Sequence, residues 1–305
     1  MSGTALVFRD VWKTYPGGVT ALAGASFSIP RGVLAGLVGP NGSGKTTSFR
    51  IALGFVRPSR GRVEVLGVDP WRREEVRRRI GYLPEKPVYP QRVPVWLLLE
   101  HVARVKTGRA GEAVRAARLV GLEGFLSRPV GSLSRGYLQR LGLALAFIGD
   151  PELLLLDEPT ANLDPASRAE ILGLIRDFAR SSGATVIVST HILPEMQRVA
   201  NYLVALEKGR VVAAGPVADL ARSIGATVVY EVEAANPREA AAALIRSEKV
   251  RAVEVPGGGR VVVYASPGVE ELLEELRRRG LAASYRAAGG SIEELYRRLY
   301  RGAAG

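Results

Sequence analysis

Hydrophobic and polar positions follow two different periods along the first two thirds of the chain. They alternate over residues 4–9 and 20–29, as in half-buried strands, whereas residues 33–38 and 153–156 are continuous apolar runs. Such runs are typical of buried parallel strands. Further strands are expected at 63–66, 80–83, 185–189, 202–206 and 210–214, and helices at 46–53, 165–181 and 193–199. Strands that alternate with helices predict an α/β core around a parallel sheet.

The period becomes helical in the middle of this core. From about residue 93 to residue 147 the apolar positions recur at helical spacing, and glycine and proline residues divide the stretch into short segments. We therefore expect a mainly helical insert, at about residues 87–150, within a first domain of residues 1–221.

The character of the chain changes near residues 220–226. The expected elements after this point are a strand at 227–233, a helix at 237–246, strands at 250–255 and 260–264, a helix at 268–279, a strand at 282–287 and a helix at 291–300. The order β-α-β-β-α-β is that of a small ferredoxin-like domain. The sequence thus predicts an α+β accessory domain at residues 222–305.

Composition excludes some classes of protein and leaves others open. The 305 residues contain no cysteine, which excludes disulfides and thiolate metal sites. The net charge is +12, and most of it lies in the first domain. A nucleic-acid partner, an anionic membrane surface and an arginine-rich protein from a GC-rich or heat-adapted source all fit this charge. No apolar run approaches the ~18–20 residues that cross a bilayer, and no secretory signal is visible, so a soluble or peripheral protein is expected.

A glycine-rich nonapeptide follows the apolar run at 33–38 and precedes the helix expected at 46–53. Its residues are Gly39, Pro40, Asn41, Gly42, Ser43, Gly44, Lys45, Thr46 and Thr47. Their spacing fits the phosphate loop, in which Gly and four further residues precede Gly-Lys-Ser/Thr. Backbone N–H groups and the positive end of the helix can surround phosphate oxygens. Lys45 would reach the β- and γ-phosphates and Thr46 would ligate Mg²⁺. The chain is therefore expected to bind a nucleoside triphosphate.

Two carboxylates end the apolar run at 153–156. Asp157, at the carboxyl end of the expected strand, can hold Mg²⁺ through water. Glu158, one residue further on, can face the γ-phosphate and orient or deprotonate the attacking water. With Lys45 in the same site, this pair predicts hydrolysis of the bound triphosphate.

The pentapeptide Leu-Ser-Arg-Gly-Tyr at 133–137, between these two motifs, makes the chain resemble the ATP-binding cassette (ABC) ATPases, the motor subunits of ABC transporters. Ser134 and Gly136 match the Leu-Ser-Gly-Gly-Gln signature of that family, while the Arg and Tyr depart from it. Ser134 is expected to cap a helix over 139–148 and to direct its hydroxyl, nearby N–H groups and the helix dipole at a phosphate.

Four more positions match the family by their place in the sequence. His191, just after the strand expected at 185–189, looks like the switch histidine that senses the γ-phosphate. Asp164 is similar to the aspartate of the D-loop, which contacts the partner subunit. Tyr15 falls where the family stacks an aromatic ring on adenine, and core packing is its alternative role. Glu85 replaces the usual Q-loop glutamine, and its carboxylate can still ligate Mg²⁺ or its water.

The resemblance covers roughly residues 4–220 and implies an α/β P-loop NTPase core with an antiparallel β part and a helical insert. It also implies ATP and Mg²⁺ as cofactors, a dimer with a second copy or a paralogous subunit, and separate transmembrane permease subunits. No nucleic acid is expected, and the chain is expected at the cytoplasmic face of the cell membrane. The variant signature, Glu85 and the ending at 291–296 are similar to the exporter branch, which moves drugs, lipids or other compounds outward.

The alternative is a soluble ABC ATPase that acts on nucleic acid or on a protein assembly. Translation-type members generally carry two cassettes, and this chain has one phosphate loop. Repair-type members separate their two nucleotide motifs by long coiled coils, whereas no heptad run lies between Lys45 and Asp157. Both differences favour the transporter.

Overall fold

The computed structural model describes residues 3–109, 111–197, 199–292 and 294–295, and contacts divide the chain into two compact units. The first unit comprises residues 1–195 and 204–214, and the second comprises 196–203 and 215–305. The boundary predicted between residues 221 and 222 stays a prediction. Most of the helix expected at 291–300, including Glu293 and Tyr296 of the C-terminal pattern, lies outside the described residues.

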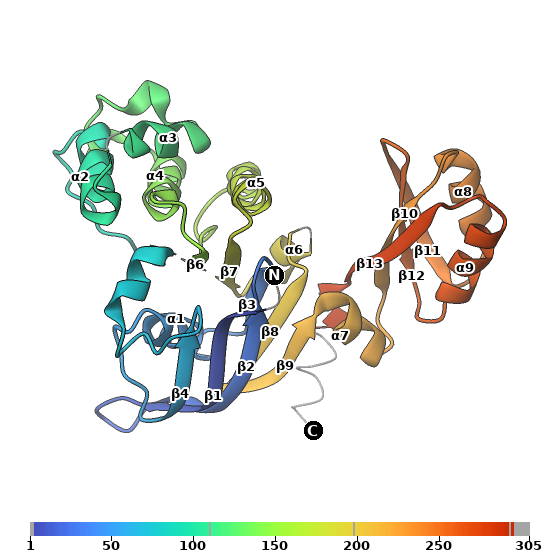
Figure 1. The fold of residues 1–305 in the computed structure, drawn as a ribbon, viewed down its shortest axis with the longest axis horizontal. Helices are drawn as coiled ribbons and strands as arrows, with labels where there is room; N and C mark the ends of the chain where they lie inside the picture. The colour runs from blue at the N-terminus through green and yellow to red at the C-terminus, as the bar shows by residue number, and fades with distance from the viewer. Residues whose placement is uncertain (1–2, 110, 198, 293, 296–305) are drawn as a thin grey trace. The chain divides into compact units, whose positions relative to one another are not determined.

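A six-stranded sheet forms the centre of the first unit, in the order β5-β6-β7-β3-β8-β9 (Figure 1). Its strands are β3 (Leu34–Val38), β5 (Ile80–Leu83), β6 (Leu153–Asp157), β7 (Thr185–Thr190), β8 (Tyr202–Glu207) and β9 (Arg210–Pro216). β6 is parallel to both β5 and β7, and β3 is parallel to β7. Every residue of β3, β6 and β7 is buried, as their apolar sequences predict. The α/β core is thus confirmed.

The parallel register brings three loops to one edge of this sheet. Val38 pairs with Thr190, and Asp157 pairs with Ser189, so β3, β6 and β7 end at the same level. The phosphate loop, the segment that begins at Glu158 and the segment that begins at His191 all start there. This edge is where ligands bind in open α/β sheets.

A second, antiparallel sheet of the first unit has the order β2-β1-β4. Its strands are β1 (Thr4–Thr14), β2 (Thr20–Pro30) and β4 (Arg60–Val65). β1 continues well beyond the stretch expected at 4–9, because its register against β2 shifts after Phe8 and a strict period of two no longer applies. Phe8 and Phe27 stack across this pair with ring centroids 4.6 Å apart.

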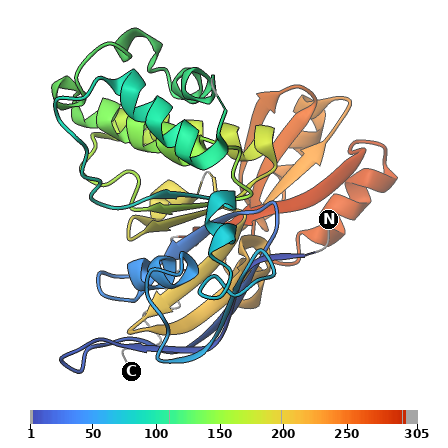
Figure 2. The same ribbon diagram turned by 60° about the vertical axis from the view of Figure 1, so that its left-hand side comes forward.

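Helices complete the first unit, and three of them form the expected insert. α2 (Val95–Thr107), α3 (Glu112–Leu119) and α4 (Arg135–Phe147) pack on one another, as both ribbon views show (Figures 1 and 2). The remaining helices are α1 (Lys45–Ala52), α5 (Pro165–Ser182), the short α6 (Leu193–Met196) and the 3₁₀ turns Glu74–Arg79, Glu123–Phe125 and Val130–Ser132. α4 begins four residues before the helix expected at 139–148, since Arg135 and Gly136 already adopt the helical conformation after an extended Ser134.

The second unit contains a four-stranded antiparallel sheet in the order β11-β12-β10-β13. Its elements are α7 (Val217–Ser223), β10 (Val228–Glu233), α8 (Pro237–Leu244), β11 (Val250–Gly257), β12 (Arg260–Ala265), α9 (Glu270–Arg278) and β13 (Ser284–Gly290). From β10 to β13 this is the element order that the sequence predicts, and the ferredoxin-like assignment stays a prediction. In the described parts of both units, no helix has the length and apolar character needed to span a membrane.

Candidate functional site

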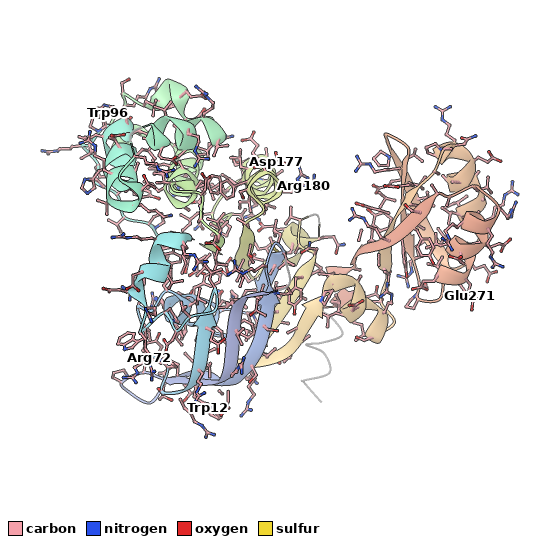
Figure 3. The ribbon with its side chains drawn as sticks, viewed as in Figure 1. Trp12, Arg72, Trp96, Asp177, Arg180 and Glu271 are labelled. Carbon is pink, nitrogen blue, oxygen red and sulfur yellow. The ribbon has the colours of Figure 1, made fainter. Side chains whose placement is uncertain are left out.

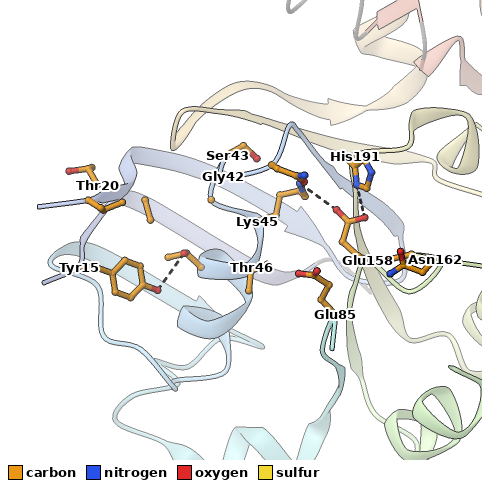
Figure 4. A pocket seen from close by; sticks show the side chains of 16 residues that line it. Tyr15, Thr20, Gly42, Ser43, Lys45, Thr46, Glu85, Glu158, Asn162 and His191 are labelled. Atoms are coloured by element: carbon orange, nitrogen blue, oxygen red, sulfur yellow. Dashed lines mark hydrogen bonds and ion pairs between the residues drawn. The ribbon is translucent and has the colours of Figure 1, made fainter. Parts of the chain in front are cut away.

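A cavity of about 510 Å³ opens at the edge where β3, β6 and β7 end (Figure 4). Much of the phosphate loop lines it, together with residues that follow β6 and β7. The lining residues are Tyr15, Val19, Thr20, Ala21, Asn41, Gly42, Ser43, Gly44, Lys45, Thr46, Thr47, Glu85, Glu158, Ala161, Asn162 and His191. Most of the residues that the sequence assigns to ATP therefore surround one cavity.

The phosphate loop passes so close to β2 that a side chain at position 44 has no space. A Cβ on Gly44 would lie 2.6 Å from the carbonyl oxygen of Ala21 and 2.7 Å from Leu22 Cδ2. Gly44 also has a φ of 108°, which only glycine adopts readily. α1 begins at the next residue, so its unpaired N–H groups point back into the loop. Within the described chain, the buried Ser43 hydroxyl has no hydrogen-bond partner, which suits a loop that wraps an anion.

Glu158 lies between Lys45 and His191 (Figure 4). Its Oε1 is 3.5 Å from Lys45 Nζ, and its Oε2 is 3.0 Å from His191 Nδ1. Lys45 Nζ also donates hydrogen bonds to the carbonyls of Gly39 and Pro40, at 2.7 and 3.2 Å. Lys45 and Glu158 are buried, whereas 45% of the His191 side chain is exposed. Contacts with Lys45 and His191 thus orient the two carboxylate oxygens of Glu158.

Asp157 offers a carboxylate oxygen that suits a cation. Its Oδ1 accepts a hydrogen bond from Ser189 Oγ at 2.5 Å, while its buried Oδ2 has no hydrogen-bond partner among the described residues. Burial raises the pKa of the Asp157 carboxyl, and the hydrogen bond from Ser189 opposes that rise. The negative charge of Glu85 also raises the pKa of Asp157. Thr46, Asp157 and Glu85 therefore fit Mg²⁺, which commonly takes one or two protein carboxylates and completes its shell with phosphate oxygens and water.

No cluster of three or more His, Cys, Asp or Glu side chains within the described ranges could hold a metal by itself.

Tyr15 lines the cavity and comes just after β1 ends. Its hydroxyl is 3.4 Å from Thr47 Oγ1, and Lys13 Nζ lies 5.0 Å from the centre of its ring. Tyr15 is partly exposed and lines the cavity, so the alternative of core packing does not describe its position.

Ser134, Gly136 and Asp164 do not line this cavity. Ser134 occupies the N-cap position of α4, but its side chain makes no capping hydrogen bond, which corrects that part of the expectation. It is exposed instead. Asp164 caps α5, because its carboxylate accepts hydrogen bonds from the backbone N–H groups of Ala166 and Ser167. The signature residues and the D-loop aspartate thus do not surround the cavity of their own chain.

Several contributors to the site escape the sequence patterns. Thr20 and Ala21 reach the cavity from β2, because the β1–β2 hairpin carries them there. Their local sequence gives no signal of this role. Ser189 holds Asp157 through its hydrogen bond to Oδ1, and it holds Glu158 through a 3.0 Å hydrogen bond that its Oγ accepts from the Glu158 backbone N–H. The pairing of β6 with β7 is the signal that identifies Ser189.

Comparison with known proteins agrees with this geometry. A family profile described as "ABC transporter" matches residues 22–161. The chain is 36% identical over 305 residues to the Nod factor export ATP-binding protein I of Rhizobium sp. (strain N33), a match that covers 98% of each chain. It is also 36% identical over 224 residues to the phosphonates import ATP-binding protein PhnC 2 of Synechococcus sp. (strain JA-2-3B'a(2-13)), which covers 67% of this chain and 82% of the relative.

Solved structures also match the chain. An ATP-binding subunit of an ABC transporter is 30% identical, has a TM-score of 0.65, and covers 72% of this chain and 93% of its own. A second structure is the dimeric post-hydrolysis state of an ATP-binding cassette bound to ADP and Pi. It is 25% identical, has a TM-score of 0.63, and covers 69% of this chain and 98% of its own. The chain therefore belongs to the ATP-binding subunits of ABC transporters, a family of ATP-hydrolysing cassettes.

Proposed function

We propose that the chain drives export across the cytoplasmic membrane, from the cytoplasmic face, through permease subunits that are separate polypeptides. We infer the direction of transport from how much of the chain each relative matches. The Nod factor export protein matches along 98% of the chain, whereas the phosphonates import protein matches along 67%. Residues 222–305, which we propose as an accessory domain, are thus shared with a protein named for export.

The direction of transport is tested in inside-out vesicles from cells that make this chain, where the cassette faces the medium. We expect ATP to drive fluorescent lipid-like or drug-like compounds into the vesicles, and no uptake when the chain carries Glu158→Gln. ATP-driven release from preloaded vesicles would show an importer instead. A chain that sediments with nucleic acid and leaves the membrane in low salt would support the soluble alternative.

Hydrolysis is proposed to centre on Glu158. Its carboxylate, fixed by Lys45 and His191, can accept a proton from a water molecule that attacks the γ-phosphate. Lys45 gives up its bonds to two loop carbonyls and places its charge on the β- and γ-phosphates. His191, exposed at the cavity, can bond a phosphate oxygen and so relate the position of Glu158 to the presence of ATP.

Mg²⁺ is proposed to be held by the Thr46 hydroxyl and Asp157, with Glu85 close enough to hold one of its waters. When bound, the ion neutralises charge on the phosphates as it develops. Ser189 keeps Asp157 turned so that Oδ2 remains free for the ion.

Each ATP is further proposed to lie between two copies of the chain, or between this chain and a paralogous subunit. Ser134, Gly136 and Asp164 are outside the cavity of their own chain, and Ser134 is exposed with a hydroxyl that caps nothing. A related cassette is dimeric with ADP and Pi bound. A head-to-tail pair would bring the signature of one copy to the cavity of the other, twice over by symmetry.

Mixed dimers test this composite site. A Ser134→Arg chain paired with a Glu158→Gln chain carries both lesions in one site and leaves the other site intact. Each parent is expected to be nearly inactive alone, and ATP hydrolysis is expected to return on mixing. The control is the Ser134→Arg chain alone, carried through the same mixing procedure. If mixed dimers form, as differently tagged chains would show, and activity does not return, the composite site is wrong.

A further inference from the structure

The turn that follows Glu158 has an unfavourable backbone. Glu158 and Asn162 have φ angles of 48° and 60°, in the left-handed region that residues with a Cβ seldom adopt. Both residues line the nucleotide cavity, where Figure 4 labels them, and Ala161 lines it as well. Such a turn keeps its shape only when the surrounding structure determines it. The turn has one backbone hydrogen bond of its own, from the Ala161 N–H to the Glu158 carbonyl at 3.0 Å, and contacts from outside it are expected to complete its support.

Thr160, in the middle of this turn, is bonded to Glu195. The Thr160 side chain is buried, and its hydroxyl donates a hydrogen bond to Glu195 Oε2 at 2.5 Å. Glu195 lies in α6, four residues after His191, and is also buried. This bond thus joins the segment that begins with Glu158 to the segment that begins with His191 at a second place, besides the contact between Glu158 and His191 themselves.

Arg168 of α5 contacts both the Glu158 turn and Glu195. Its Nε donates a 2.8 Å hydrogen bond to the carbonyl of Leu163, at the end of the same turn, and its Nη1 lies 3.5 Å from Glu195 Oε1. Burial raises the pKa of the Glu195 carboxyl, while the Thr160 bond and the charge of Arg168 lower it. The other charges that act on Glu195 are those of Glu158 and His191. Glu195 is therefore placed among the catalytic groups without lining their cavity.

We propose that Glu195 is a positioning residue for ATP hydrolysis, which acts through Thr160 and Arg168 to fix the Glu158 turn against the His191 loop. The inference rests on the roles proposed above for Glu158 and His191. Because Glu195 and Thr160 are not among the cavity-lining residues, their loss should misplace the attacking water and leave the phosphate loop intact. The expected sign of such a role is a lower kcat with little change in ATP affinity.

Thr160→Val removes the hydroxyl and keeps a similar shape. We expect kcat to fall about ten- to a hundredfold, the range for the loss of a buried hydrogen bond to a charged group, while the KM and Kd for ATP change by less than about twofold. Thr160→Ser restores the donor and should regain most of the rate. Glu195→Ala should resemble Thr160→Val, and the double variant should be no slower than the slower single variant, since both remove the same bond.

Two controls make the outcome specific. Asp177→Asn changes an exposed carboxylate on the same helix as Arg168, labelled in Figure 3, and should leave kcat unchanged. Glu195→Gln keeps an acceptor for Thr160 and should be faster than Glu195→Ala. The inference is overturned if Thr160→Val turns over normally, if Thr160→Ser is as slow as Thr160→Val, or if ATP affinity falls in step with kcat. Normal turnover by Glu158→Gln would instead overturn the role proposed above for Glu158, on which this inference rests.

Discussion

Glu158→Gln is expected to lower the rate of ATP hydrolysis by about a hundredfold or more, while ATP affinity stays close to that of the unchanged chain. Glutamine fills the same space and can still accept a hydrogen bond, but it cannot take a proton from water. Removal of a general base typically costs about 10²–10⁴ in rate. Steady-state release of phosphate and equilibrium binding of ATP measure the two quantities separately.

The matched control for this change is Glu170→Gln. Glu170 is exposed on α5, where it pairs with Arg140 at 2.6 Å, and it has no place in the cavity. Its substitution removes the same charge from the same unit and should leave turnover unchanged. Near-normal turnover by Glu158→Gln would remove Glu158 from the role of base.

Lys45→Ala is expected to weaken ATP binding about ten- to a hundredfold. A charge-assisted hydrogen bond contributes about 1.5–3 kcal/mol, and ~1.4 kcal/mol is a factor of ten in Kd. The buried ammonium group is within 3.5 Å of Glu158 and bonds two loop carbonyls, so its loss also leaves Glu158 without its cationic neighbour. Both binding and hydrolysis should therefore decrease, in contrast to Glu158→Gln. Isothermal titration with ATP and Mg²⁺ measures the affinity.

A chain that ends at Ile224 is the control for this experiment. Every residue that lines the cavity precedes residue 195, so the shortened chain should bind ATP with nearly the original affinity. Unchanged affinity in Lys45→Ala would mean that the phosphate loop does not hold ATP as proposed. A soluble shortened chain without ATP binding would mean that the proposed accessory domain contributes to the nucleotide site.

Much of the core could be predicted from the sequence, because its central strands β3, β6 and β7 are buried throughout and contain mostly apolar residues. Leu153–Asp157 is an example, where five residues are fully buried and the last is the carboxylate. The short helices were less predictable. α7 follows Pro216 directly and has only seven residues, too few for a clear period. α6 ends at Met196 rather than 199, and Gln197, the next residue, bonds the Gly290 carbonyl and the Ile292 N–H within the second unit.

The chemistry of the site was predictable where one short segment contains it. The phosphate loop and the pair Asp157 and Glu158 are such segments, and they lie at the cavity or beside it. Contributions that depend on strand pairing or on a distant turn were not predictable in this way. Thr20 comes from a hairpin, and the bond from Thr160 to Glu195 joins residues 35 positions apart. No local pattern encodes such a contact.

Sedimentation velocity of the Glu158→Gln chain, with and without ATP and Mg²⁺, tests most directly that two copies close on ATP to form the hydrolytic site. We expect monomers without nucleotide and, with ATP, a dimer that retains one ATP for each chain, because the triphosphate binds both halves and is not consumed. Addition of Ser134→Arg to the same chain should return it to the monomer, since the signature then cannot contact the nucleotide of the partner. A Glu158→Gln chain that is saturated with ATP and remains a monomer would contradict this.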